Sequence, residues 1–195
     1  MSTHGKESRA RVRADPARPR AKRGRKAPLR PEPGGDARRA VAAAPELSPL
    51  PRLIHALREE KIRFQIASMS GAILQGVPAT TLDTDIWIDL NARQCMRVLN
   101  LCRQLGATVR ANTVVDLSDG SIVNFLYEVQ GRRGFQYEYQ HAQRVRWLHP
   151  VVAVLPLARI DASKKFVGRP KDLAHLPLLE QTMRLKRHLT RQRGN

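Results

Sequence analysis

Residues 80–88, TTLDTDIWI, combine a polar start with a run of large apolar residues. β-Branched and aromatic residues favour a strand, in which successive side chains alternate between the two faces. Asp83 and Asp85 are therefore expected on one face, and Ile86 and Ile88 are expected to point into the core. Two carboxylates this close repel each other unless a cation lies between them, and hard oxygen ligands favour Mg²⁺ or Mn²⁺. The pattern indicates a metal site, with an exposed polar strand end as the alternative.

The chain upstream of this segment predicts a turn of small residues between a strand and a helix. Residues 64–67, FQIA, are typical of a short buried strand, and residues 68–76, SMSGAILQG, open with small residues into a short helix. Backbone N–H groups at such a turn and helix start bind phosphate groups. Together with the two aspartates, this order predicts a phosphate-binding turn that faces a metal site.

This order of elements resembles the polymerase-beta-like nucleotidyltransferase superfamily, especially the minimal bacterial type that includes abortive-infection toxins. In that superfamily a Gly-Gly or Gly-Ser turn is followed by a helix ending in glycine and then by a Thr-x-Asp-x-Asp segment with an apolar tail. Residues 68–76 and 81–88 match that order here. Residues 151–157 resemble the closing strand, and residues 169–172, RPKD, resemble an Arg-x-Lys-Asp segment. The resemblance covers roughly residues 50–180.

The resemblance implies an α/β (α+β) fold in which a small mixed β-sheet is flanked by helices. The domain is expected at residues 46–180, after a basic tail over residues 1–45 and before a basic C-terminal helix or tail over residues 181–195. The first tail holds 13 Lys or Arg, 4 Asp or Glu and no aromatic residue, so we expect it to be disordered. Tails of this charge contact nucleic-acid backbones or keep a protein soluble, and both interpretations stay open.

The resemblance also implies an activity: metal-dependent transfer of a nucleotidyl group from a nucleoside triphosphate to a hydroxyl of an RNA, a protein or a small molecule. Asp83 and Asp85 would bind Mg²⁺ or Mn²⁺. The basic and small residues that match the superfamily's triphosphate site are Ser68, Ser70, Gly71, Thr81, Lys164, Lys165, Arg169 and Lys171. Of the two adjacent lysines, Lys164 is preferred for the triphosphate, and a solvated basic helix face is the alternative.

Three positions depart from the superfamily's pattern. The third catalytic carboxylate matches Asn124 in residues 122–126, IVNFL, and an amide cannot act as a base or balance the charge of a metal. Glu128 lies on the same strand face as Asn124 but about 13 Å away, at about 3.3 Å per residue. A replacement for the third carboxylate would therefore have to come from Asp116, Asp119 or Glu138. The other departures are Ala79 where relatives carry arginine, and residues 68–69 where relatives carry paired glycines.

These departures leave two other functions open. One is a catalytically impaired module of the nucleotidyltransferase fold that binds nucleotide or RNA, in a toxin–antitoxin or regulatory pair. The other is a nucleic-acid-binding protein whose basic tails dominate. No run of apolar residues approaches the length of a membrane span and no secretory signal pattern is present, so a cytoplasmic protein is expected.

The remaining sequence predicts further elements. Ser48 and Pro49 start a helix that runs to Glu60, and Asn91 caps another that ends at Gly106. A hairpin is expected from residues 113–117 and 121–129, and a further strand at residues 134–140. Two helices are expected near the C-terminus, one after Leu157 and one from Pro170. Cys95 and Cys102 are expected to pack in the core rather than to bind a metal. His141 and His149 are expected to have structural roles.

Overall fold

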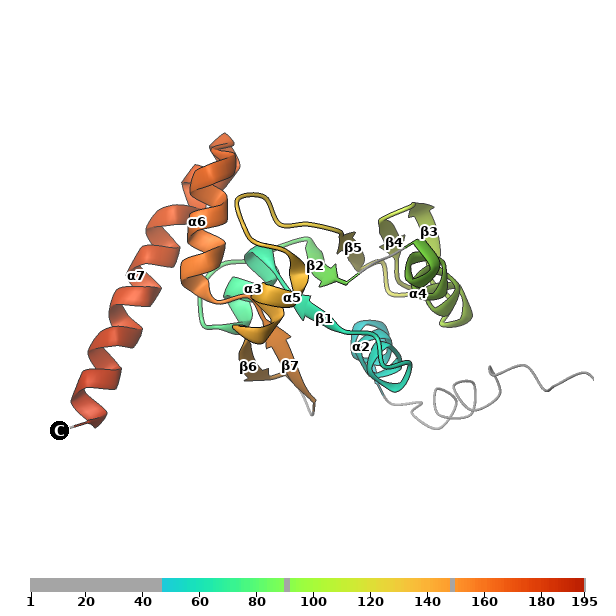
Figure 1. Cartoon of the computed structure of the whole chain (residues 1–195), viewed down its shortest axis with the longest axis horizontal. Coiled ribbons are helices and arrows are strands. Elements are labelled where there is room, and N and C mark those ends of the chain that lie inside the picture. Colours follow the sequence, from blue (N-terminus) through green and yellow to red (C-terminus); the bar gives the residue numbers. More distant parts are fainter. Residues whose placement is uncertain (1–46, 90–91, 148–149, 195) are drawn as a thin grey trace, which may run out of the picture. The chain divides into compact units, whose positions relative to one another are not determined.

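The computed structural model describes residues 47–89, 92–147 and 150–194. In this part of the chain a seven-stranded mixed sheet has helices on both faces (Figure 1), so the predicted α/β fold class is confirmed. The tail expected at residues 1–45 lies outside the described residues, and so do Asn91 and His149.

The helices and strands follow each other along the described chain in an irregular order. The helices are α2 (Pro49–Glu59), α3 (Ser68–Leu74), α4 (Ala92–Gln104), α5 (Phe135–Gln140), α6 (Leu157–Val167) and α7 (Pro170–Arg193). The strands are β1 (Phe64–Ile66), β2 (Asp83–Ile88), β3 (Thr108–Ala111), β4 (Val114–Asp116), β5 (Ile122–Leu126), β6 (Gln143–Arg146) and β7 (Val151–Val154). Their order across the sheet is β3-β4-β5-β2-β1-β7-β6, so the strand with the two aspartates is central.

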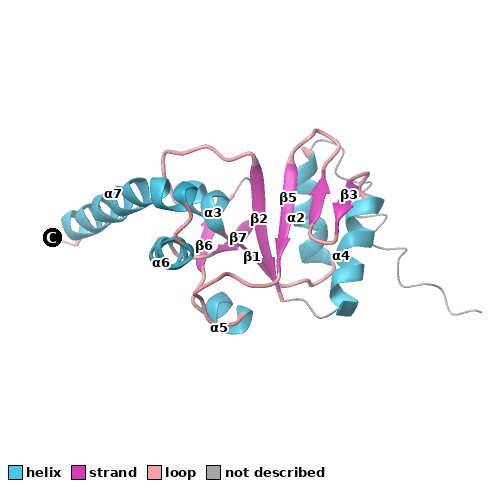
Figure 2. Cartoon of the chain, turned by 90° about the horizontal axis from the view of Figure 1, so that it is seen from above, coloured by secondary structure: helices cyan, strands magenta, loops and turns pink. Residues whose placement is uncertain are grey.

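The sheet is buried on both faces, which explains the apolar run at the end of β2. Helices α2 and α4 lie on one face, and α3, α5, α6 and α7 lie on the other (Figure 2). Ile86 and Ile88 are fully buried against the first group, as predicted. Trp87 points to the opposite face, where it is 1% exposed and packs with Phe135 and Ile160. A strand covered on both faces needs consecutive apolar residues rather than alternation.

The prediction of a strand over residues 134–140 is wrong, because residues 135–140 form α5. Alternating aromatic and polar residues are typical of a half-buried strand. In this helix, however, Phe135 and Tyr139 are four residues apart and their rings stack with centroids 5.2 Å apart. Phe135 and Glu138 are the buried residues of the helix, and their spacing of three gives it an inward face. The alternation in the sequence hid this helical spacing.

Most other predicted elements are confirmed with shifted ends. Helix α2 begins at Pro49, and α7 begins at Pro170 and continues to Arg193, so residues 181–193 extend the same helix. Strands β4 and β5 pair antiparallel through a turn in which Gly120 has φ +82°, as the hairpin prediction requires. Strands β3 and β6 were not predicted. Both are short and lie at the two edges of the sheet.

The cysteines belong to the core, as predicted. Cys102 is fully buried in the cluster beneath α2 and α4, and Cys95 packs against the same cluster. Among the described residues, no helix has the length and apolar character to cross a membrane.

Candidate active site

A cavity of about 380 Å³ opens around the start of β2. Its walls come from the start of α3, from β2 and β5, from the loop after β5, from α6 and from the start of α7. Most of the predicted site residues line it, although they are far apart in the sequence: Ser68, Thr81, Asp83, Asp85, Asn124, Lys164, Arg169 and Lys171. The fold therefore brings together residues that sequence similarity alone had grouped.

Strand pairing brings Asn124 against the two aspartates. Strands β2 and β5 are parallel, with Asp85 directly opposite Asn124. The Asn124 side-chain amide donates hydrogen bonds from Nδ2 to Asp83 Oδ2 at 2.6 Å and to Asp85 Oδ1 at 3.2 Å. Thr81 Oγ1 donates to the other oxygen of Asp83 at 2.8 Å. Both carboxylates thus face one point, and the amide offsets part of their repulsion.

The pKa of Asp85 is raised above its ordinary value. Burial is the main cause, because it disfavours the charged carboxylate, and the negative charge of Asp83 adds to it. Hydrogen bonds from Asn124 and Ser68 and the positive charge of Lys164 act in the opposite direction without outweighing burial. A bound cation would reverse this balance and favour the ionised form.

The turn before α3 adopts a backbone conformation that suits glycine. Ser68 has φ +53°, in the left-handed region that favours glycine. The Ser70 hydroxyl donates to Ala67 O at 2.9 Å and accepts from Asp85 N at 3.0 Å, so it joins the turn to β2 instead of facing the cavity. A Cβ atom at Gly71 would lie 2.9 Å from Ile66 O. Gly71 is therefore needed for close packing.

The opposite wall of the cavity carries basic residues held by one carboxylate. Lys164 Nζ donates to Asp172 Oδ1 at 2.9 Å, and Arg169 Nε donates to Asp172 Oδ2 at 2.6 Å. Burial raises the pKa of Asp172, but these hydrogen bonds outweigh burial and hold the pKa below its usual value. Lys165 points away and pairs with Asp161 and Glu180. Of the two lysines, only Lys164 lines the cavity.

His175 also lines the cavity, although it is not among the residues predicted from the sequence. Its Nδ1 lies 3.3 Å from Lys164 Nζ and accepts a hydrogen bond from the ammonium group, because Lys164 has no acceptor to offer. Burial and the charge of Lys164 lower the pKa of His175, which keeps the ring neutral. The available signal was the spacing of three residues from Asp172, which puts both side chains on one face of α7.

The carboxylates considered as replacements for a third metal ligand are engaged elsewhere. Asp116 pairs with Arg110, Asp119 accepts hydrogen bonds from Ser121, and Glu138 pairs with Arg159. Across the described ranges, no three His, Cys, Asp or Glu side chains are grouped to hold a metal ion. Glu128 lines the cavity as a separate carboxylate.

The oxygen donors that remain fit one divalent cation. Asp83 and Asp85 supply two carboxylates on one face of a rigid strand, and Asn124 supplies a neutral oxygen if its amide turns over. Two metal ions would need more negative charge than these residues carry. The donor set therefore suits a single Mg²⁺ or Mn²⁺.

Comparison with known proteins identifies the fold. The structure superposes on the solution structure of antibiotic-resistance factor ANT(2″)-Ia with a TM-score of 0.52 and 13% identity, covering 74% of this chain and 90% of that one. It also superposes on the crystal structure of ANT(2″)-Ia in complex with adenylyl-2″-tobramycin, with a TM-score of 0.50, 14% identity and coverage of 80% and 99%. The two proteins share a fold.

That fold is the nucleotidyltransferase-like fold, so the fold expected from the sequence resemblance is confirmed. No protein-family model matches this sequence, and no curated protein does. The minimal bacterial type therefore stays a prediction.

Proposed function

We propose that the cavity binds a nucleoside triphosphate together with Mg²⁺ or Mn²⁺, and that the protein transfers the nucleotidyl group to a hydroxyl of an acceptor. The observation that carries this proposal is the arrangement of opposite charges across one cavity. Asp83 and Asp85 lie on one wall, and Lys164, Arg169 and Lys171 lie on another. A metal–triphosphate complex needs both, because carboxylates bind the cation and basic groups bind the phosphates.

The residues of this chain have separate tasks in the proposed reaction. Asp83 and Asp85 hold the cation, which neutralises charge on the triphosphate when it is bound. Lys164 and Arg169 bind phosphate oxygens, and Asp172 keeps both of these cations on the cavity wall. Phosphoryl transfer depends mainly on such positioning and charge stabilisation.

Proton removal from the acceptor hydroxyl is the weak step. Asn124 cannot accept this proton, because its amide has no basic site. Glu128 lines the cavity, and no ion pair or hydrogen bond engages its carboxylate among the described residues. We therefore assign Glu128 as the proton acceptor. Transfer is expected to be slow, because Glu128 lies about 13 Å from Asn124 along the chain, at about 3.3 Å per residue.

A small molecule is the acceptor we favour. ANT(2″)-Ia has been crystallised with adenylyl-2″-tobramycin, a small molecule that carries an adenylyl group. This chain covers nearly all of that fold, so a similar acceptor fits the proposal. An RNA or protein acceptor, and a cytoplasmic toxin of the minimal bacterial type, remain the alternatives.

A second candidate function rests on Asn124. Its amide donates to both aspartates, so the three side chains form a hydrogen-bonded set without a metal. Such a site suits a module that binds nucleotide but does not transfer it. This module would act as a sensor or as one partner of a toxin–antitoxin or regulatory pair.

Two measurements on the same samples separate these functions. The protein is incubated with ATP, Mg²⁺ and either tobramycin or total RNA, and pyrophosphate release is measured together with the mass of the acceptor. Release with a matching mass increase supports the transferase, provided Asp83→Ala/Asp85→Ala loses both and Glu59→Ala, an exposed carboxylate on α2, keeps both. ATP binding without release supports the sensor. Absence of binding would overturn both functions.

A further inference from the structure

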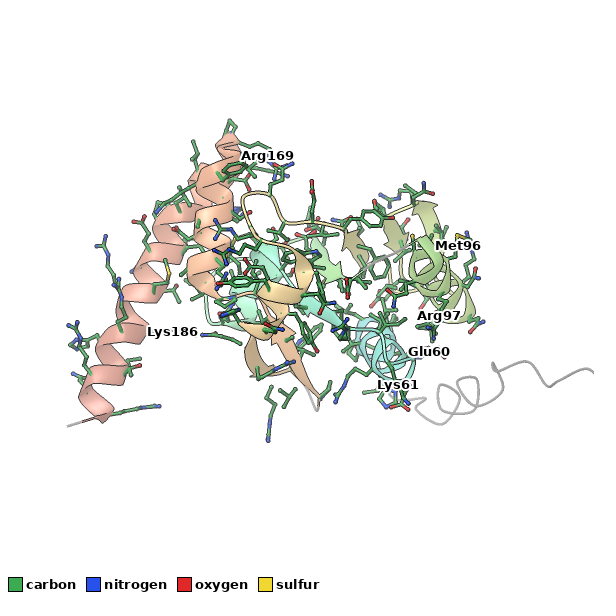
Figure 3. All side chains as sticks on the ribbon, viewed as in Figure 1. Glu60, Lys61, Met96, Arg97, Arg169 and Lys186 are labelled. Atoms are coloured by element: carbon green, nitrogen blue, oxygen red, sulfur yellow. The ribbon has the colours of Figure 1, made fainter. Side chains whose placement is uncertain are left out.

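A second cavity, of about 350 Å³, lies between the C-terminal end of α2 and the β6–β7 hairpin. Its charged lining residues are all cationic: Arg58, Lys61, Arg63 and Arg144. The other described residues that line it are apolar or aromatic, so no carboxylate lines it in this part of the chain. We call this cavity the basic groove. Figure 3 shows Lys61 at the end of α2, well away from Arg169 at the candidate active site.

Lys61 in the basic groove is held in a strained backbone conformation. Its φ is +55°, in the left-handed region, where α2 ends with hydrogen bonds from Lys61 N to Arg58 O and from Ile62 N to Leu57 O, each 2.9 Å long. Glycine is the usual residue at this position of a helix end. Among the described non-glycine residues, positive φ occurs only at Lys61 and Ser68, and Ser68 lines the candidate active site. Strain of this kind persists only where the surrounding structure enforces it, and it is enriched at functional sites.

The groove offers cations but no open aromatic face. Tyr139 is the aromatic ring nearest to its charges, and Phe135 stacks on it with centroids 5.2 Å apart. The Arg144 guanidinium covers the same ring at 4.9 Å from its centroid. A nucleobase therefore finds no free face of this ring to stack on. Recognition in the groove must come from charge.

Exposure decides what kind of anion fits the groove. Arg58, Lys61 and Arg144 are exposed, and Arg63, at 52% side-chain exposure, already pairs with Asp89. A single exposed cation holds a small anion weakly, because water screens the attraction. A chain of phosphates contacts several such cations at once and releases its condensed counterions. A groove lined by several exposed cations therefore suits an extended polyanion.

We propose that the basic groove binds the phosphate backbone of a nucleic-acid strand, without base specificity. This binding is separate from nucleotidyl transfer and does not depend on the function proposed for the other cavity. It differs from binding by the basic tails, because the groove is formed by folded residues of α2, β1, α5, β6 and β7. Loss of one phosphate contact on a single strand lowers the slope of log K against log salt by about 0.7.

The test is a salt titration of a fluorescent oligouridylate with the full-length protein. Lys61→Asn removes one charge while asparagine tolerates the left-handed conformation, so the helix end is preserved. The slope is expected to fall by about 0.7 in Lys61→Asn and by about twice that in Arg58→Gln/Lys61→Asn. The matched control is Arg103→Gln, which removes one exposed charge from α4 outside the groove and should leave the slope unchanged.

Three results would overturn the proposal. If Arg103→Gln lowers the slope as much as Lys61→Asn does, total charge and not the groove controls binding. If polyglutamate binds as tightly as oligouridylate and loses the same slope, the groove attracts any polyanion and the assignment to nucleic acid is wrong. If the slope is unchanged in all three variants, the basic tails account for the binding and the proposed role of the groove is wrong.

Discussion

The candidate active site and the basic groove both carry several cations, but they arrange them differently. In the candidate active site the cations face carboxylates, and one of them, Lys164, is buried with Asp172, with side chains 8% and 4% exposed. In the groove no carboxylate is among the lining residues, and Arg58, Lys61, Arg63 and Arg144 are all exposed. A site of mixed charge with a buried ion pair orients one ligand, whereas an exposed cationic surface attracts a chain without orienting it. Substitutions should therefore have large effects in the first cavity and small, salt-dependent effects in the second.

The largest effect is expected at Asp172. Replacing it with alanine leaves the buried Lys164 ammonium without its anionic partner, which costs about 3 kcal/mol of unfolding free energy. Urea unfolding of Asp172→Ala measures this loss. The double variant Lys164→Met/Asp172→Leu should recover most of the stability, because no unpaired charge remains. A single variant as stable as the wild type would show that the cavity is wet and that this pair is not buried.

Asn124→Asp tests the amide between the two aspartates. The change removes a donor and adds a third negative charge, so we expect the free energy of unfolding to fall by about 2 kcal/mol without metal. Mg²⁺ should restore that stability, because three carboxylates form a stronger cation site. Thermal unfolding with Mg²⁺ and with a chelator measures both effects. Equal melting temperatures with and without chelator in this variant would contradict the account.

The raised pKa of Asp85 and the lowered pKa of Asp172 predict opposite effects of pH on the free energy of unfolding. A raised pKa in the folded state means that ionisation of Asp85 is unfavourable there, so stability falls as the pH rises through the folded pKa. Asp85→Asn should remove this fall and raise the unfolding free energy at pH 7 in the absence of metal. The lowered pKa of Asp172 works the other way, and its contribution is lost as the pH falls. Urea unfolding of Asp85→Asn and wild type, measured from acidic pH to pH 7, separates the contribution of Asp85 from that of Asp172.

Lys61→Gly is expected to have the smallest effect on stability, and in the stabilising direction. Glycine relieves the left-handed strain at the end of α2, but it also loses more entropy on folding, so the gain is about 0.5 kcal/mol. The same variant should weaken binding of oligouridylate at low salt. Higher stability together with weaker binding would show that Lys61 serves binding and not the fold. This result would support the contrast between the two cavities. Lower stability would show that the lysine side chain supports the fold.

Most of the residues predicted for the site line one cavity, because their positions obey local rules. Strand alternation put Asp83 and Asp85 on one face, and the helical spacing favoured Lys164 over Lys165. The left-handed conformation of Ser68 could not be predicted, because serine carries no signal for it. Ser70 and Gly71 were predicted to bind phosphate, yet their contacts tie the turn to the sheet, which only the packing reveals.

The parts that could not be predicted depend on contacts between distant segments. The groove combines the end of α2 with residues near 140 and 150, and nothing in one segment indicates the other. Helix α5 was misassigned because Phe135 and Tyr139 fit both a strand and a helix pattern until their stacking is known. His175 gains its role only because α7 packs against α6 beside Lys164.

The central claim is that Asp83 and Asp85 bind a cation that carries a nucleoside triphosphate. Isothermal titration of ATP into the wild type with Mg²⁺, and again with a chelator, tests it most directly. We expect ATP to bind only with Mg²⁺. The affinity should fall at least about tenfold in Asp83→Asn/Asp85→Asn and stay unchanged in Glu59→Gln. Equal affinity with chelator, or in the variant without the two carboxylates, would contradict it.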